Sequence, residues 1–299
     1  NVNRTTNTRV IGGGWGEITF MDGLTFKTQA GLDIANVRDY MYWDTESGDG
    51  YGYGGLIEEV NSTYATWNWQ NVLNFTRTFN SVHNLTATAV QEYTHSETEY
   101  MDGSVYELSD PFFSEHIISN TFGQKDVGGW KSENGLASYM FRANYNYDSK
   151  YYIGASIRYD GLSKLPKDTR WGTFWGASAA WRLSREKFWT EAPVNEWFND
   201  LRLRASYATI GNSALGSDYP YLGTYGAKLV GPMAGIAWNV MGNNNLKWET
   251  TETFDIGLDG ALFNNRMTFE IAYWQKNSKD LVLRVPTPPT MGTPQQLLL

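Results

Sequence analysis

Two neighbouring segments of the sequence alternate between apolar and small or charged side chains, and this alternation limits the fold more than any other feature. The segments are Tyr151–Asp160 and Phe174–Leu183, joined by a polar loop. Because successive side chains of a β-strand point to opposite faces, each segment predicts a strand with one apolar and one wet face. The apolar faces hold Ile153, Ala155, Ile157, Tyr159, Trp175, Ala177, Ala179, Trp181 and Leu183, and the wet faces hold Gly154, Ser156, Arg158, Asp160, Gly176, Ser178, Ala180 and Arg182. Arginine on the wet face, with Trp and Tyr at the rims of the other, is typical of a transmembrane β-barrel.

Composition is compatible with a barrel and excludes several other classes. Mean hydropathy is −0.46, and no stretch approaches the roughly 18 to 20 apolar residues of a membrane helix. The 15% aromatic content, with 13 Trp and 19 Tyr, suits interfacial girdles as well as sugar-stacking platforms. A net charge of −8 argues against nucleic acid as a partner.

Cysteine and histidine usage gives no sign of a metal or cofactor. The chain has no cysteine, so disulfides and thiolate sites are absent. The three histidines, His83, His95 and His116, are too few and too scattered to predict a metal site. We therefore expect no cofactor, no metal and no catalytic residues, because no nucleophile elbow or metal-ligand spacing is present.

The rest of the chain repeats the strand pattern. Turn-forming residues at Asp22–Gly23, Asn80–Ser81, Asp148–Lys150 and Asn264–Asn265 predict short turns. Long polar connections alternate with these turns, which is the asymmetry of an outer-membrane barrel. The ten predicted strands are Trp15–Met21, Thr25–Ile34, Thr63–Thr76, Leu85–Thr98, Gly135–Tyr147, Tyr151–Asp160, Phe174–Leu183, Leu201–Ile210, Glu249–Leu262 and Met267–Lys279, and the long connections are Ala35–Ser62, Glu99–Asn134, Gly161–Thr173 and Gly211–Trp248.

One connection departs from this order. Ser184–Asp200 falls on the short-turn side but runs through 17 residues, and its start predicts a helical turn that stops before Pro193. Two interpretations stay open: its aromatic residues lie at the membrane surface, or they form a small packed cap over the barrel rim. These residues are Phe188, Trp189, Trp197 and Phe198.

Several motifs in family order resemble the SusC/RagA family of TonB-dependent transporters, outer-membrane proteins of Bacteroidetes. They are RYDGLSK and KDTRWGTFWGASAAWRLSREKFW within Arg158–Trp189, WFNDLRLRASYATIGN at Trp197–Asn212, NNNLKWETTETFDIGLDGALFNNRMTFEIAYWQKNSKDLVL at Asn243–Leu283 and VPTPPTMG at Val285–Gly292. The upstream part, including DGLTFKTQAGLDIAN, matches more loosely. The resemblance implies an all-β fold, an antiparallel transmembrane β-barrel, of which this chain supplies about ten of roughly 22 strands.

The resemblance also implies a domain organisation and a function. Residues 1–299 are expected to form a partial barrel domain, without the family's signal peptide, N-terminal extension, TonB box, plug or final barrel strands. The implied function is TonB-dependent import of glycans or peptides across the bacterial outer membrane, not an enzymatic reaction. The implied partners are a SusD-like lipoprotein lid, TonB through a region outside this chain, outer-membrane lipid, and an oligosaccharide or peptide substrate.

Two groups of residues are candidates for contacts with substrate. The predicted lumen-facing arginines could contact substrate or plug, although a solvated lumen or ion pairs to groups such as Asp160 are favoured. Aromatic side chains in the long loops could stack on a sugar face or a peptide, or pack against neighbouring loops. The arginines are Arg142, Arg158, Arg182, Arg202 and Arg204, and the loop aromatics are Trp43, Tyr51, Tyr53, Tyr219, Tyr221 and Trp238.

Two further patterns favour structural interpretations. Gly48–Gly55, with Asp44, Glu46 and Asp49 nearby, is a weak calcium candidate that lacks the EF-hand spacing, so a mobile loop is the favoured interpretation. Five tryptophans are interpreted as lipid-interface residues. They are Trp15, Trp67, Trp69, Trp175 and Trp181.

Three alternative functions remain open at this stage. A SusC-like barrel could serve as a structural subunit of a larger outer-membrane complex, or as a passive porin without a plug. A soluble glycan-binding all-β protein with aromatic platforms is a further possibility. The sequence does not identify the substrate or the oligomeric state.

Overall fold

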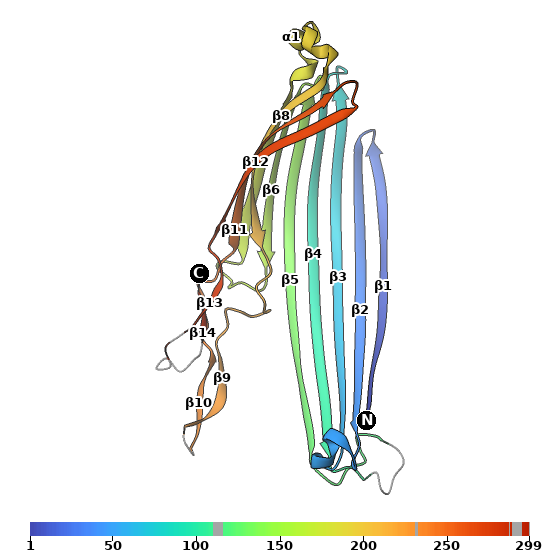
Figure 1. Cartoon of the computed structure of the whole chain (residues 1–299), viewed down its shortest axis with the longest axis vertical. Coiled ribbons are helices and arrows are strands. Elements are labelled where there is room, and N and C mark those ends of the chain that lie inside the picture. The colour runs from blue at the N-terminus through green and yellow to red at the C-terminus, as the bar shows by residue number, and fades with distance from the viewer. Residues whose placement is uncertain (110–115, 231–232, 287, 289–294, 299) are drawn as a thin grey trace. The chain divides into compact units, whose positions relative to one another are not determined.

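The fold is a long, antiparallel β-sheet with short turns at one end of its strands. The computed structural model describes residues 1–109, 116–230, 233–286, 288 and 295–298. Within these residues, ten strands form one sheet in the order β1-β2-β3-β4-β5-β6-β7-β8-β11-β12 (Figure 1). The strands are β1 Val2–Met21, β2 Leu24–Trp43, β3 Leu56–Phe79, β4 His83–Tyr106, β5 Lys125–Tyr147, β6 Tyr151–Leu162, β7 Trp171–Arg182, β8 Phe198–Asn212, β11 Glu249–Leu262 and β12 Met267–Lys279.

Smaller elements lie in the connections. Two separate hairpins pair β9 (Thr224–Val230) with β10 (Met233–Val240) and β13 (Leu283–Pro286) with β14 (Gln295–Leu298). The helical elements are short: η1 (Gly48–Tyr53), η2 (Leu183–Arg185), α1 (Lys187–Thr190) and η3 (Pro193–Glu196). None of the helices in the described residues is long and apolar enough to cross a membrane.

The structure confirms the ten predicted strands, and β11 and β12 have the predicted bounds. The predicted bounds of β1 to β5 are wrong, because these strands have 20 to 24 residues: β1 begins well before the predicted start at Trp15, and β2 to β5 extend well into the predicted loops. Backbone ladder pairing continues there although the apolar alternation has ended. The predicted loop Gly211–Trp248 is also wrong in part, since it contains the β9–β10 hairpin.

The predicted short turns are confirmed and depend on residues that tolerate positive φ. Asn80 and Ser81 have φ of 48° and 60°, and Asp148 and Ser149 have φ of 50° and 52°. Two consecutive residues with positive φ match the twist of hairpin strands. Gly23 has a φ of +85°, and a Cβ on this residue would lie 2.0 Å from the Thr76 carbonyl oxygen. Glycine is therefore required in the β1–β2 turn.

Contacts divide the chain into two units, each with a small apolar cluster. The first unit comprises residues 1–15, 29–69 and 94–135, and its buried cluster is formed by Tyr42, Ile57, Val105 and Leu108. The second unit comprises residues 16–28, 70–93 and 136–299. Its cluster lies under the β6–β7 loop and is formed by Leu162, Leu165, Phe174, Leu246 and Trp248. In both units the apolar cluster lies at a loop, and the sheet faces carry few buried side chains.

The hairpin β6–β7 has the two faces that its alternation predicts. Ala155 pairs with Ala177 and Ile157 pairs with Trp175, so the apolar residues of both strands share one face. This face is open, because Ile153, Ile157 and Trp175 are 59%, 50% and 50% exposed. An exposed band of large apolar side chains is unusual in a water-soluble protein and suits contact with lipid.

The segment between β7 and β8 forms a compact cap of η2, α1 and η3. Glu186 accepts hydrogen bonds from the Tyr151 hydroxyl at 2.5 Å and from Trp181 Nε1 at 3.1 Å. Trp189 Nε1 donates to the Phe198 carbonyl, and the two rings meet edge to face. Phe188 and Trp197 remain 57% and 62% exposed. The segment therefore combines packing inside the cap with aromatic residues directed outward.

Candidate functional site

The predicted arginines lie on one face of the sheet from β5 to β8, which we call the arginine face. Cross-strand partners share a face, and Arg142 pairs with Ser156, Arg158 with Met140, and Arg182 with Arg202. Arg204 lies two residues from Arg202 on β8 and pairs with Ala180. The structure thus places all five arginines opposite the open apolar face.

Four of these arginines form ion pairs with carboxylates of the same face. Arg158 Nε lies 2.8 Å from both carboxylate oxygens of Asp160, which is only 7% exposed, and Arg158 Nη2 donates to Ser138 Oγ at 2.9 Å. Arg182 donates two parallel hydrogen bonds to Asp200 at 2.7 and 2.8 Å. A bidentate pair of this kind fixes both side chains.

The other two pairs form a connected network on β8, β11 and β12. Arg202 donates to Asp259 Oδ2 at 2.6 Å, and Arg204 reaches Asp259 Oδ1 at 3.3 Å. Arg204 also contacts Asp255 and donates to Glu270 Oε1 at 2.5 Å. Two arginines in this part of the arginine face therefore meet three carboxylates of the wall itself.

Arg142 differs from the other four. It is exposed, and no ion pair or hydrogen bond of its guanidinium is found within the described residues. Its neighbours across the sheet are small, since Gly154, Ser156 and Gly176 line the same shallow hollow. Of the five arginines, Arg142 is thus the one whose guanidinium is most accessible to a substrate or another part of the protein.

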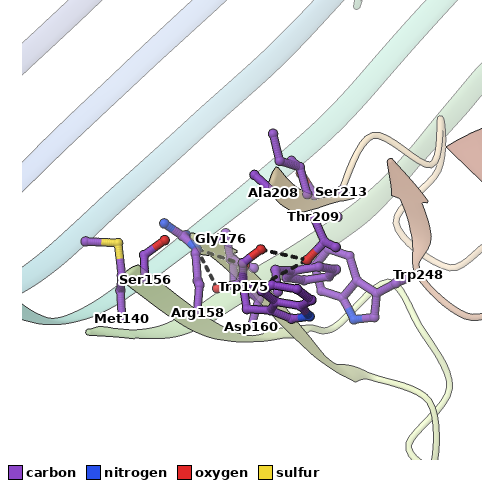
Figure 2. A pocket seen from close by; sticks show the side chains of 14 residues that line it. Met140, Ser156, Arg158, Asp160, Trp175, Gly176, Ala208, Thr209, Ser213 and Trp248 are labelled. Carbon is purple, nitrogen blue, oxygen red and sulfur yellow. Dashed lines mark hydrogen bonds and ion pairs between the residues drawn. The ribbon is translucent and has the colours of Figure 1, made fainter. Parts of the chain in front are cut away.

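A cavity of about 370 Å³ opens beside Arg158, where β6, β7 and β8 meet the loop that carries Trp248. Figure 2 shows the Arg158–Asp160 pair on one side and the Thr209 hydroxyl bonded to the Trp175 backbone on the other. Arg158 and Asp160 bind each other, so the cavity presents a neutral polar wall next to aromatic surface. Such a surface suits an uncharged polar group.

The loop aromatics fall into two sets. In the first unit, the Trp43 and Tyr53 rings lie 6.4 Å apart and Tyr53 lies 5.8 Å from Tyr106, so these rings pack against each other. Tyr51 projects further and is 72% exposed. Of this set, Tyr51 has the ring most accessible to another molecule.

In the second unit, Trp238 stacks on Tyr225 with ring centroids 3.8 Å apart, across the β9–β10 hairpin. Tyr221 packs against the apolar cluster under the β6–β7 loop. Tyr219 is 41% exposed. The structure therefore gives Tyr221 and Trp238 packing contacts and leaves part of the Tyr219 ring open.

The expected ion pair with Asp160 is confirmed by its contact with Arg158, but the other acidic partners of the arginine face were not predicted. Asp255 and Asp259 lie four residues apart on β11, so they share a face, and Asp259 pairs directly with Arg202. The same period-two alternation that identified the arginines could have found them. Arg170 was also missed: its Nε is buried and has no hydrogen-bond acceptor within the described residues. No sequence pattern distinguishes it.

Within the weak calcium candidate Gly48–Gly55, residues Gly48–Tyr53 form the 3₁₀ helix η1. Asp44 accepts a hydrogen bond from Ser47 Oγ at 2.7 Å, and this bond holds the pKa of Asp44 below its usual value. Asp44 is thus already hydrogen-bonded within its own turn. Among the described residues of this loop, no group of three carboxylates comes close enough together to support the calcium hypothesis.

Comparison with known proteins assigns the chain to a family. Residues 2–297 match the family described as "TonB dependent receptor-like, beta-barrel". The chain belongs to this family. The ten-stranded sheet is accordingly part of a barrel wall, and the family is one of receptors rather than enzymes.

Individual relatives confirm the resemblance to SusC and RagA. TonB-dependent receptor P39 of Formosa agariphila is 31% identical over 273 residues, which are 90% of this chain and 26% of that protein. TonB-dependent receptor SusC of Bacteroides thetaiotaomicron is 32% identical over 171 residues, 55% of this chain and 17% of SusC. The structure of the RagAB peptide transporter matches with a TM-score of 0.88 and 25% identity, covering 99% of this chain and 33% of the matched chain.

The chain spans a minor part of these relatives. It covers between 26% and 30% of the three curated relatives that match it over nine-tenths or more of its length. The family and the barrel fold are therefore established for these residues. The activity of a whole TonB-dependent receptor is proposed below.

Proposed function

We propose that this chain is part of the barrel wall of a TonB-dependent importer of the bacterial outer membrane. The likeness of 99% of the chain to the RagAB transporter, at a TM-score of 0.88, is the observation that carries the proposal. The similarity to SusC supports it independently from sequence. The proposed substrate is a peptide or a glycan: RagAB is described as a peptide transporter, and the glycan alternative is what the resemblance to the SusC/RagA family implies.

The open apolar face supports a position in the outer membrane. Tyr147, Tyr151 and Trp181 form an aromatic row with centroids 6.3 and 6.4 Å apart. A second row contains Tyr159 and Trp171, 4.7 Å apart. The rows are eight residues apart on β6, or about 26 Å along the strand. A strand tilted by about 35 to 45° spans about 18 to 21 Å of membrane thickness over this length, somewhat less than the apolar band of about 25 Å between two aromatic girdles.

In this proposal the arginine face lines the lumen. A slip of one residue would place the Arg142 side chain in lipid. Arg142 pairs with Ser156, about midway between the two aromatic rows, so the cost would be about 2 to 4 kcal/mol, as for an arginine near the midplane. The ion pairs with Asp160, Asp200 and Asp259 leave this wall nearly neutral. A neutral polar wall agrees with transport of glycans or peptides and gives no strong preference for an anionic cargo.

The proposal includes a SusD-like lipoprotein as lid and TonB as the source of energy. Uptake of an oligosaccharide or peptide mixture by cells should require both this protein and TonB, because import through a plugged barrel needs energy from the inner membrane. The test compares uptake in the wild type with uptake after deletion of the TonB-interacting segment of the whole protein. Unchanged uptake would contradict the importer and favour a structural role or a passive pore.

The partner is tested separately. Purification from native membranes in mild detergent should recover a lipoprotein with this protein, in a constant ratio. Isolation without any lipoprotein would contradict the proposed lipoprotein partner. It would not contradict TonB-dependent uptake, which is measured separately. Single-channel recordings complete the test, because an open conductance in the purified protein would identify a porin.

A further inference from the structure

Three metal-ligating side chains meet on one face of the β4–β5 strand pair. His95 and Glu97 lie two residues apart on β4, and Glu133 approaches from β5. One ligand atom from each lies within 4.8 Å of the other two, and His95 Nε2 is 3.9 Å from Glu133 Oε2. We propose that this His95–Glu97–Glu133 cluster binds a divalent transition-metal ion, with zinc as the probe.

The β-sheet backbone and a neighbouring aromatic ring hold the ligands of the cluster in position. Residues i and i+2 of a strand share a face, so His95 and Glu97 are held side by side by the β4 backbone. The imidazole of His95 lies against the indole of Trp67 on the neighbouring strand β3, with ring centroids 5.8 Å apart. A ligand whose orientation is fixed by packing binds a metal with less loss of side-chain freedom.

The local charge favours a cation. Glu97 and Glu99 share a face of β4, and a carboxylate oxygen of Glu133 lies within 4.8 Å of one of Glu97, so carboxylates outnumber the ammonium group of Lys131 in this patch. Lys131 Nζ contacts Glu97 Oε1 at 2.7 Å. Like charges held close together on adjacent strands are destabilising. A metal ion between Glu97 and Glu133 would relieve this repulsion.

The donor set selects the class of ion. One imidazole and two carboxylates suit zinc and its transition-metal neighbours, whereas calcium and magnesium prefer oxygen ligands alone. Zinc binds such groups at about 2.0 to 2.2 Å, so the ligand atoms must close in by about 1 Å. Rotation of the two flexible glutamate side chains can supply this movement. A fourth position remains for water or an external ligand.

The first experiment measures zinc affinity of the whole protein in detergent after treatment with a chelator. Wild-type protein should bind one zinc at this site, and cobalt at the same site should give the visible absorption of a nitrogen- and oxygen-ligated ion. His95→Ala and Glu133→Gln should each weaken zinc binding at least tenfold. His116→Ala is the matched control, since it removes a histidine from the same unit outside the cluster and should bind as the wild type does.

Lys131 provides an opposite variant. Lys131→Met removes the ammonium that competes for Glu97, so zinc affinity should increase severalfold although the protein loses an ion pair. Equal zinc affinity in the wild type and His95→Ala would overturn the site, and so would the absence of zinc binding. Unchanged or weaker binding by Lys131→Met would show that Glu97 is not a ligand, which contradicts the three-ligand cluster.

Discussion

At the residue scale, the arginines of one face differ in what they contact, and this difference predicts their contributions to stability. Arg182 donates two hydrogen bonds to Asp200, whereas Arg142 has no such partner within the described residues. Arg182→Met should therefore destabilise the barrel by about 1 to 2 kcal/mol, below the full value for a charged hydrogen-bonded pair because solvent reaches both groups.

Arg142→Met is the matched control for this change. It removes the same charge from the same face and should leave the unfolding temperature nearly unchanged. The measurement is thermal unfolding of both variants in one detergent, followed by heat-modifiable migration on gels. Equal losses in the two variants would show that net charge of the wall, and not the Arg182–Asp200 pair, determines stability.

Glu186 predicts a pH dependence for the cap between β7 and β8. The Tyr151 hydroxyl, followed by Trp181 Nε1, donates to its carboxylate and holds the pKa of Glu186 below its usual value. A lowered folded-state pKa gives stability that is present above the unfolded value of about 4.3 and is lost as pH falls through the folded value.

The difference in unfolding temperature between the wild type and Glu186→Gln should accordingly be constant near neutral pH and shrink as the pH falls below about 4.3. Glu191→Gln, in the same segment, serves as the control and should show a smaller difference at neutral pH. A Glu186→Gln difference that grows on acidification would have the wrong sign for this hydrogen-bonded carboxylate.

At the scale of elements, the sequence predicted strands well where one face is apolar and poorly where it is not. In β11 the alternation runs from Phe254 to Leu262, and the predicted bounds Glu249–Leu262 agree with the structure. In β1 the predicted strand begins at Trp15, but pairing begins at Val2. Residues 2–14 of β1 are largely polar or glycine, so their backbone pairing leaves no period in the side chains.

The two faces of β7 predict opposite responses to the same substitution. Ala177 lies on the open apolar face and pairs with Ala155, whereas its neighbour Ser178 pairs with Gly154 on the arginine face. Both side chains are exposed. If the apolar face contacts lipid, Ala177→Arg should cost about 2 to 4 kcal/mol, because Ala177 lies midway between the two aromatic rows, and Ser178→Arg should cost much less.

Urea titration of the two variants, refolded into the same liposomes, measures this difference. Ser178→Arg controls for the size and charge of the new side chain, because the two positions are adjacent. Equal destabilisation would contradict the membrane-facing assignment of the apolar band. It would not affect the register, which the described strand pairing fixes.

At the scale of the whole molecule, the family and the barrel were predictable from sequence, and the candidate binding residues are still predictions. The apolar–polar alternation of side chains is repeated in successive strands of the barrel wall, so it can be recognised in the sequence. Loop residues such as Tyr51 and Tyr219 carry no period, so their contacts depend on what approaches them. The acids that neutralise the arginine face belong to the wall, which is why the same alternation could have located Asp255 and Asp259.

The open edges of the sheet give the last prediction. In the described residues, β1 and β12 have one neighbouring strand each, and all 20 residues of β1 are exposed. Each edge presents unpaired backbone N–H and C=O groups, which hydrocarbon cannot satisfy. A polypeptide of residues 1–299 alone should therefore fail to form a heat-modifiable barrel in liposomes, whereas the whole protein should form one under the same conditions. Far-UV circular dichroism and gel migration measure both properties. If residues 1–299 alone insert as a compact, heat-modifiable species, these strands form a closed barrel by themselves. This result would contradict the prediction that further strands are needed to complete the barrel wall.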